Sequence, residues 1–308
     1  MKGPSITIIG SLNMDIVVEA DRLPELGETV SGRSVHFIPG GKGGNQAVAA
    51  ARLGAEVDMI AFIGNDAFGE TLIQSLTSSG VLVKRIKQVE ETSTGMASIL
   101  LAEDDNQIVV VPGANAYCLP ESIEDLEQSI AASDLVLMQL EIPLETVSAA
   151  AELAEKHSKP VILNPAPAAE LPQALLKRVN YITPNLSELY LLTGLDPNSA
   201  SLEEAMDALL EQGPECVVAT LGSEGSAFKR KGDILKKVPA HKVPIVDTTG
   251  AGDAFNAGLA FGISSGYSLE QAVTFAGSVS ALAVSAFGAQ TGMPSIEAVN
   301  KFIYSLTN

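Results

Sequence analysis

The chain of 308 residues has no tryptophan, few other aromatic residues and few basic ones. Lysine and arginine together number 19, against 37 aspartates and glutamates, which gives a formal net charge of −18. Because such a surface repels phosphate backbones and anionic lipid, neither nucleic acid nor a membrane is an expected partner. A polyanionic ligand would therefore have to be held by backbone amides, a metal ion and a few cations such as Lys42.

Cysteine and histidine are equally sparse. Cys118 and Cys216 lie in unrelated segments, which excludes a disulfide framework and is typical of buried thiols in a reducing compartment. His36, His157 and His241 are scattered along the chain. We therefore predict no histidine metal cluster.

A transmembrane helix and a signal peptide are not expected either. The uncharged stretch at 271–296 is long enough to cross a membrane, but it contains Pro294 and lacks flanking basic residues. We interpret it as a buried helix followed by a turn. The chain runs at once into a strand-like segment at 5–10, which leaves no room for a signal peptide. We expect a soluble, cytoplasmic protein.

Strand-like apolar runs alternate with helical patterns from Val57 onward. The pairs are 57–63 with 68–76, 135–140 with 144–156, 161–163 with 171–177, and 181–183 with 186–192; a strand at 216–220, a hairpin at 227–238 and helices at about 251–265, 269–286 and 295–306 follow. Such alternation predicts an α/β fold, with a doubly wound, mostly parallel sheet flanked by helices. We expect a single domain over residues 1–308.

Two segments break this alternation. Residues 16–38 contain strand-like pieces and turn residues, and 94–111 are predicted to form two strands joined by the Glu-Asp-Asp-Asn tetrad at 103–106. We expect these pieces to pair as a small antiparallel β sheet, built from about 14–40 and 93–113. It would form a lid over the carboxyl-end crevice where doubly wound folds bind ligands. Its free edges favour a homodimer through the lid.

A glycine-rich turn at 246–258 is the most informative motif. Backbone N–H groups at a helix start lack intrahelical partners, and Gly250 and Gly252 let a phosphate approach them closely. Asp253 would repel that phosphate, unless it accepts a proton from an attacking hydroxyl while the amides hold the developing charge. The motif therefore indicates either phosphoryl transfer to an alcohol or an ordinary capped turn. It matches neither a Walker A loop nor a dinucleotide fingerprint.

A second glycine cluster at 39–46 opens another helical run. Its glycines bring backbone close to a ligand, and Lys42 and Asn45 supply polar groups. Upstream, Asn13 and Asp15 are two residues apart, so in extended backbone they face the same side. Such a pair suits vicinal sugar hydroxyls, although both residues also form turns and caps. Glu141 is a further carboxylate at a predicted strand end.

Two later segments allow both a structural and a functional interpretation. Asn185 and Glu188 are spaced as a capping box, and the same oxygens could lie beside a hydrated Mg²⁺. The turn at 220–225 is either a simple turn or a nucleotide-contacting loop.

Together these motifs resemble the ribokinase (PfkB) family of carbohydrate kinases over essentially the whole chain. The resemblance rests on the glycine cluster near residue 40, the Asn-x-x-Glu at 185–188 and the Asp-Thr-Thr-Gly-Ala-Gly-Asp run near 250, and extends to 10–15, 138–141 and 164–168. It implies ATP-dependent phosphorylation of D-ribose at O5, with Mg²⁺ and K⁺.

The resemblance also implies roles for individual residues. Asp253 would be the general base, and Gly250, Ala251 and Gly252 the anion hole. The sugar site would comprise Asn13, Asp15, Gly41, Lys42, Gly43, Asn45, Glu141 and Asp253. ATP would contact Asn185, Thr220, Gly222, Ser223, Gly225 and Gly252, with Glu188 near magnesium. A monovalent-cation site would involve Asp247, Thr249, Ala283, Ala286, Gly288 and Gly292, mostly through carbonyls; the family pattern usually has Ser at the last position.

The sequence is also compatible with substrates other than ribose. A sugar acid or phosphate would require more basic residues than Lys42, and a nucleoside would require aromatic stacking partners. Deoxyribose differs from ribose by one hydroxyl and is harder to exclude, and fructose is a further possible substrate. A non-catalytic sugar or nucleotide sensor on the same fold is the alternative of another class.

Overall fold

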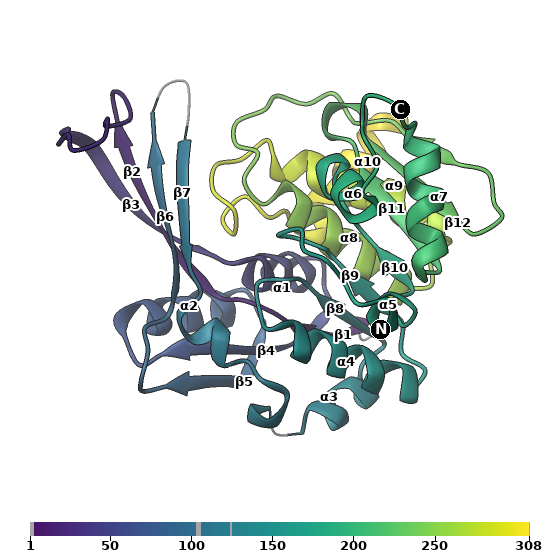
Figure 1. Cartoon of the computed structure of the whole chain (residues 1–308), viewed down its shortest axis with the longest axis horizontal. Helices are drawn as coiled ribbons and strands as arrows, with labels where there is room; N and C mark the ends of the chain where they lie inside the picture. The colour runs from purple at the N-terminus through teal and green to yellow at the C-terminus, as the bar shows by residue number, and fades with distance from the viewer. Residues whose placement is uncertain (1–2, 103–105, 124, 308) are drawn as a thin grey trace.

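The computed structural model describes residues 3–102, 106–123 and 125–307, and its centre is a nine-stranded sheet (Figure 1). The strand order is β13-β12-β11-β10-β9-β8-β1-β4-β5. The strands are β1 (Ser5–Ile9), β4 (Glu56–Gly64), β5 (Leu82–Val89), β8 (Leu135–Met138), β9 (Val161–Leu163), β10 (Tyr181–Ile182), β11 (Cys216–Thr220), β12 (Ser226–Arg230) and β13 (Lys236–Val238). Only the β11–β12–β13 edge is antiparallel. The predicted mostly parallel sheet is confirmed.

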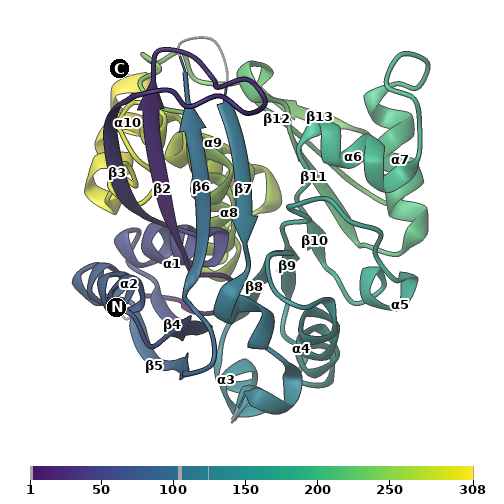
Figure 2. The same cartoon turned by 60° about the vertical axis from the view of Figure 1, so that its left-hand side comes forward.

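Helices cover both faces of this sheet (Figures 1 and 2). The helices α1 (Lys42–Arg52), α2 (Ala67–Ser78), α8 (Ala251–Ser264), α9 (Leu269–Ala283) and α10 (Ile296–Thr307) pack into one core cluster, whereas α3 (Leu126–Ala132), α4 (Leu144–Lys156), α5 (Gln173–Leu176), α6 (Leu186–Thr193) and α7 (Leu202–Gln212) pack into the other. Neighbouring strand residues alternate between the clusters, as Met59 and Ile60 do. Strands buried on both faces explain the near-continuous apolar runs in the sequence.

Some elements were not predicted from the sequence. Strand β5 contains two lysines and an arginine, so it lacks the apolar run of the central strands. Helix α7 begins with a capping box between Ser201 and Glu204, a signal that could have identified it. The uncharged stretch at 271–296 forms most of α9 and the turn after it, as expected. None of the helices in the described part of the chain is long and apolar enough to span a bilayer.

The predicted lid is a separate four-stranded sheet of order β3-β2-β6-β7. It comprises β2 (Asn13–Ala20), β3 (Gly32–Gly40), β6 (Gly95–Leu101) and β7 (Asn106–Val111), and it rises away from the core (Figure 1). Both hairpins are antiparallel, but the central β2–β6 pair is parallel. Strands β2 and β6 both leave the core from the carboxyl ends of parallel strands, so they run in the same direction. Residues 103–105 of the predicted turn tetrad lie outside the described residues.

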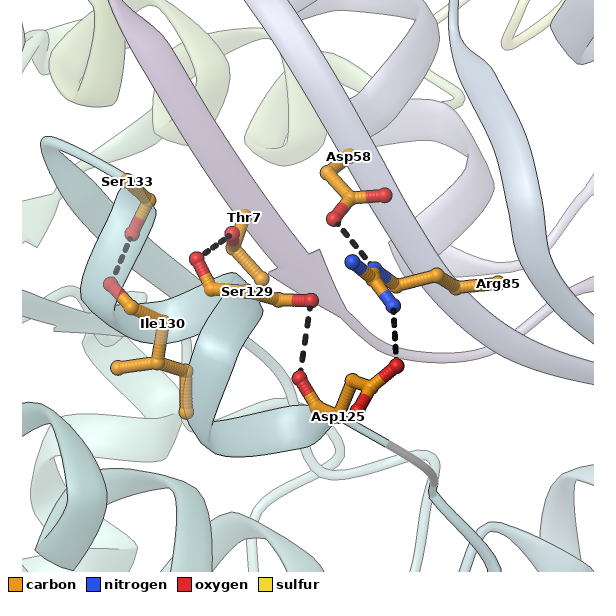
Figure 3. A network of polar contacts seen from close by, with 7 residues as sticks. All are labelled: Thr7, Asp58, Arg85, Asp125, Ser129, Ile130 and Ser133. Carbon is orange, nitrogen blue, oxygen red and sulfur yellow. Dashed lines mark hydrogen bonds and ion pairs between the residues drawn. The ribbon is translucent and has the colours of Figure 1, made fainter.

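Polar contacts join β1, β4, β5 and α3 away from the predicted site residues (Figure 3). Arg85 donates to Asp58 at 2.9 Å beside a register shift in the β4–β5 pairing, and its guanidinium also lies 3.9 Å from Asp125. Thr7 donates to the main-chain oxygen of Ser129 at 3.3 Å. These contacts attach α3 to the strands.

Candidate active site

The predicted site residues gather at the carboxyl edge of the sheet. Asn13 follows β1, Glu141 follows β8 and Asn185 follows β10. Helices α1 and α8 pack against each other and start at the same edge, which brings Lys42 and Asp253 to the same place. Parallel strands direct their carboxyl ends to one side, so residues far apart in sequence meet there.

Asp253 lies in the first turn of α8 and is 7 % exposed. Its carboxylate accepts one hydrogen bond from Asn45 Nδ2 at 2.9 Å and another from Gln46 Nε2 at 3.0 Å. Burial raises the pKa of Asp253, and Glu141 adds to that effect, whereas Lys42 and the two amides act in the opposite direction. The result is a buried carboxyl group whose negative charge is disfavoured by burial and only partly compensated by neighbouring donors.

The predicted anion hole is the turn that begins α8. Gly250 has φ +77°, a left-handed conformation that favours glycine, and the position of a Cβ on Gly252 has no atom within 4 Å. Asn256 Nδ2 donates to Gly252 O at 2.9 Å, which fixes this peptide. The N–H of Ala251 donates to Thr248 O at 3.2 Å, so in this structure it is not free to bind an anion.

The predicted sugar residues surround the same carboxylate. Burial, together with the charges of Glu141 and Asp253, raises the pKa of Asp15 to about 7, and Lys42 partly opposes this. Glu141 accepts from the Ser11 hydroxyl at 2.5 Å and from the Lys42 N–H at 3.0 Å. Asn45 Oδ1 is buried without a hydrogen-bond partner. It is an acceptor available for a ligand hydroxyl.

The base of the lid is joined to the predicted sugar residues through Asn115. Its Nδ2 donates to Asn13 Oδ1 at 2.8 Å, and its Oδ1 accepts from Leu12 N at 2.9 Å. A Cβ on Gly95 would lie 2.2 Å from Asn115 Nδ2, and one on Gly40 would lie 2.4 Å from Asp15 Oδ2. The lid strands can approach the site this closely only because both positions are glycine. Gly41 and Gly43 likewise lie against the backbone of 10–13.

The predicted nucleotide residues also lie side by side. Asn185 and Glu188 form a complete capping box at the start of α6, so the structural interpretation of this motif is confirmed. Thr220 N donates to Pro184 O at 3.0 Å, which joins the 220–225 turn, including Gly222 and Ser223, to this segment. A Cβ on Gly225 would lie 2.1 Å from Val238 O, so this glycine has a packing role in any case. A metal role for Glu188 stays a prediction.

The residues predicted to bind a monovalent cation are brought together. Asp247 accepts from Thr249 N at 2.8 Å and from Gly288 N at 2.9 Å. A Cβ on Gly292 would lie 2.7 Å from Gly288 O, 3.2 Å from Ala283 O and 3.5 Å from Ala286 O. Three carbonyl oxygens therefore lie within 3.5 Å of one point, the Cβ position of residue 292, where a side chain would not fit; Gly288 O also accepts from Gly292 N at 2.9 Å. Carbonyl oxygens are hard ligands that suit such a cation.

Several residues of the site were not predicted as functional from the sequence. They are Ser11, Gln46, Asn115, Gln139 and Asn164. Gln46 had one sequence signal, its place in the glycine cluster. Among the residues that the structure describes, no group of three or more His, Cys, Asp or Glu side chains could hold a metal ion.

The chain is similar to known carbohydrate kinases over nearly its full length. The pfkB family carbohydrate kinase model matches residues 4–296. A ribokinase of Lactococcus lactis is 44 % identical over 295 residues, which are 96 % of this chain and 95 % of that protein. A deoxyribokinase of Salmonella typhi is 36 % identical over 305 residues, with 97 % and 98 % covered.

A solved structure agrees with this result. The structure of an Arabidopsis thaliana ribokinase complexed with ribose and ATP has a TM-score of 0.92 at 33 % identity, and covers 98 % of this chain and 99 % of that one. The family match, the sequence identity and the fold all extend over nearly the full length. The chain belongs to the pfkB family of carbohydrate kinases.

Proposed function

We propose that this protein transfers the γ-phosphoryl group of ATP to O5 of D-ribose. The observation that carries the proposal is the Asp253 carboxylate, which is buried, held by two amide donors and placed in the first turn of α8 next to Gly252. The ribokinase of L. lactis and the A. thaliana ribokinase complexed with ribose and ATP support this substrate pair.

Ribose would be held by the polar groups around Asp253. The Asp15 carboxylate can accept from two vicinal hydroxyls, with Asn13 beside it on the same face of β2. The unpartnered Asn45 Oδ1 can accept from a third hydroxyl. Because Asn13 and Asn45 are already buried and held by hydrogen bonds to Asn115 and Asp253, a bound sugar would lose little further orientation freedom during the reaction.

In the proposed transfer step, Asp253 accepts the proton of the 5-hydroxyl as the new O5–phosphorus bond forms. The bond from the γ-phosphorus to the bridging β–γ oxygen breaks, and ADP leaves with that electron pair. The backbone N–H groups of Gly250 and Gly252 would stabilise the negative charge on the oxygens of the transferred group. The N–H of Ala251 would contribute once its hydrogen bond to Thr248 O breaks. Most of the acceleration would come from positioning and electrostatics, with about 10²–10⁴-fold from the base.

Two cations complete the proposal. Mg²⁺ would neutralise phosphate charge when bound, and Glu188 is the residue of this chain that would lie near it. K⁺ supplies positive charge beside the anion hole. The convergent carbonyls of Ala283, Ala286 and Gly288 suit such an ion, and Asp247 and Thr249 fix the facing turn.

We also propose that the protein acts in the cytoplasm as a homodimer that pairs through the lid. Strand β7 exposes four consecutive apolar residues, and the neighbours Ile108 and Val109 are 54 % and 64 % exposed. Because they point to opposite faces, Ile108→Asp and Val109→Asp test each face in turn. Light scattering of the wild type should give twice the chain mass, and one variant should give the monomer. A monomeric wild type would overturn the dimer.

ATP turnover by purified protein tests the function directly. The phosphate acceptors tested are ribose, deoxyribose, fructose and the nucleoside adenosine, each with Mg²⁺ and with either K⁺ or Na⁺. Turnover that is selective for ribose and stimulated by K⁺ is expected. Turnover with only one of the other acceptors would refute ribose as the substrate. No turnover with any of the four would favour the non-catalytic sensor.

Deoxyribose is the second candidate, because of the deoxyribokinase relative. The structure favours ribose, since deoxyribose would leave part of the desolvated Asp15 carboxylate without a partner. The ratio of kcat/KM for the two sugars decides between them.

A further inference from the structure

A chain of buried amides runs behind the Asp253 carboxylate. Gln46 Nε2 donates to Asp253 Oδ1 at 3.0 Å and lies 3.2 Å from Asn164 Oδ1. Gln46 Oε1 in turn accepts from Gln139 Nε2 at 2.6 Å. Both glutamine side chains are fully buried. Asp253, Gln46 and Gln139 come from α8, from α1 and from the end of β8, so this chain connects elements that are distant in sequence.

The direction of each amide in this chain is determined by its neighbours. A carboxylate only accepts hydrogen bonds, so Gln46 must present its nitrogen to Asp253 and its oxygen to Gln139. Gln139 must then present its nitrogen to Gln46. Gln139 Oε1 is left buried without a partner, facing Gly10, where a Cβ would lie only 2.1 Å away. The stabilising contact of the Gln139 amide is therefore the bond that fixes Gln46.

We infer that Gln46, locked in one orientation by Gln139, is a positioning residue that aims the Asp253 carboxylate and stabilises its negative charge. The inference rests on the proposed role of Asp253 as general base. Neither glutamine directly contacts the predicted anion hole or residues 185–188 in the described contacts. Gln46 also bonds Asn164, whose amide donates to Thr183 O, so an unchanged KM for ATP is needed to show that the effect passes through Asp253. A hydrogen bond to a charged group is among the stronger ones, and its loss should shift a pKa by about one unit.

Three other charged groups face Asp253. Lys42 faces it from α1, Glu141 from the segment after β8 and Asp15 from β2. All three remain when Gln46 or Gln139 is replaced. A comparison of wild type and variant at each pH therefore isolates the glutamine contribution to first order.

The first test measures stability and does not depend on activity. Gln46→Met removes the donor, so the folded protein should keep Asp253 protonated to a higher pH. The loss of stability caused by the missing hydrogen bond therefore appears only at pH values at which Asp253 is ionised in the folded wild type. The gap in Tm between wild type and Gln46→Met should therefore widen as the pH rises through the raised pKa of Asp253. Gln212→Met, which removes a half-buried amide bonded to Leu192 O, is the matched control and should give a constant gap.

The second test is the pH profile of kcat with saturating ribose and ATP. The acidic limb should move up by about one pH unit in Gln46→Met, which is roughly a tenfold loss of turnover on that limb. Gln139→Met leaves Asp253 and both its donors in place but unlocks Gln46, so it should give a smaller shift in the same direction. The KM for ATP should not change in either variant.

The outcomes separate this inference from the proposed function. A constant Tm gap in a folded Gln46→Met variant would overturn it, as would a lower kcat with an unmoved acidic limb. If Gln46→Met does not fold, the same two measurements on Gln139→Met decide. If the wild type does not phosphorylate ribose, the proposed function fails, and the dependence of the Tm gap on pH still supports or refutes the inference.

Discussion

Replacing Asp15 by asparagine should make the free protein more stable above neutral pH. The pKa of this carboxyl is raised from 3.8 to about 7 by burial and by Glu141 and Asp253. The folded state therefore binds more protons than the unfolded state between about pH 4 and pH 7, and the free energy of unfolding falls with rising pH over that window. Above pH 7 the cost is fully present, and below pH 4 it is absent.

The magnitude follows from the shift in pKa. Roughly three units at 1.36 kcal/mol each give about 4 kcal/mol as an upper bound. Because Asp15 is half-buried, water screens part of this cost, and we expect about 2 kcal/mol at pH 8. Asparagine keeps the size of the side chain and has no charge to desolvate. The variant should therefore match the wild type near pH 4 and exceed its stability at pH 8.

Urea denaturation at pH 4.5 and pH 8 measures this difference. Asp233→Asn, at an exposed carboxylate in the β12–β13 turn, is the matched control and should change stability little at either pH. A difference between Asp15→Asn and the wild type that stays constant with pH would refute the electrostatic reasoning. A variant less stable than the wild type at pH 8 would do so as well. Loss of ribose affinity in the stabilised variant would show that the destabilising charge serves binding.

Three further predictions concern the base, a glycine and the sugar site. Asp253→Asn should lower kcat by about 10²–10⁴-fold while calorimetry shows ATP affinity within about twofold of wild type; normal turnover would exclude Asp253 as the base. Gly225→Ala should lower the free energy of unfolding, measured by urea denaturation, by more than about 1 kcal/mol, because φ is +98° and the added Cβ would overlap Val238 O. Gly222→Ala, at φ +60° but in open space, is the control and should lower it less. Equal losses of stability would contradict the packing role of Gly225. The KM for ribose should fall up to ~10-fold from pH 6 to pH 8 as Asp15 ionises, and a flat or rising KM would contradict the role of Asp15.

The sequence alone determined the fold class, the lid and the two glycine-rich segments. Alternating apolar runs and helical patterns are local signals, and so are a glycine pair before a helix and the Asp253 that follows it. The same local signals gave both a capping and a metal interpretation for Glu188. The structure confirmed the cap, because both capping hydrogen bonds are present.

Only the tertiary structure decided which polar groups meet. Gln139 and Gln46 are 93 positions apart, and Gln46 and Asp253 are 207 apart, yet each pair forms a buried hydrogen bond. Such bonds depend on which strands are neighbours and on where α1 and α8 begin. The spacing of residues within a single segment does not predict either of these. The pKa of Asp15 likewise depends on the carboxylates of Glu141, in the segment after β8, and of Asp253, in α8. Local sequence patterns determine which segments form helices and which form strands. Desolvation and charge coupling arise only when segments distant in sequence pack together and exclude water.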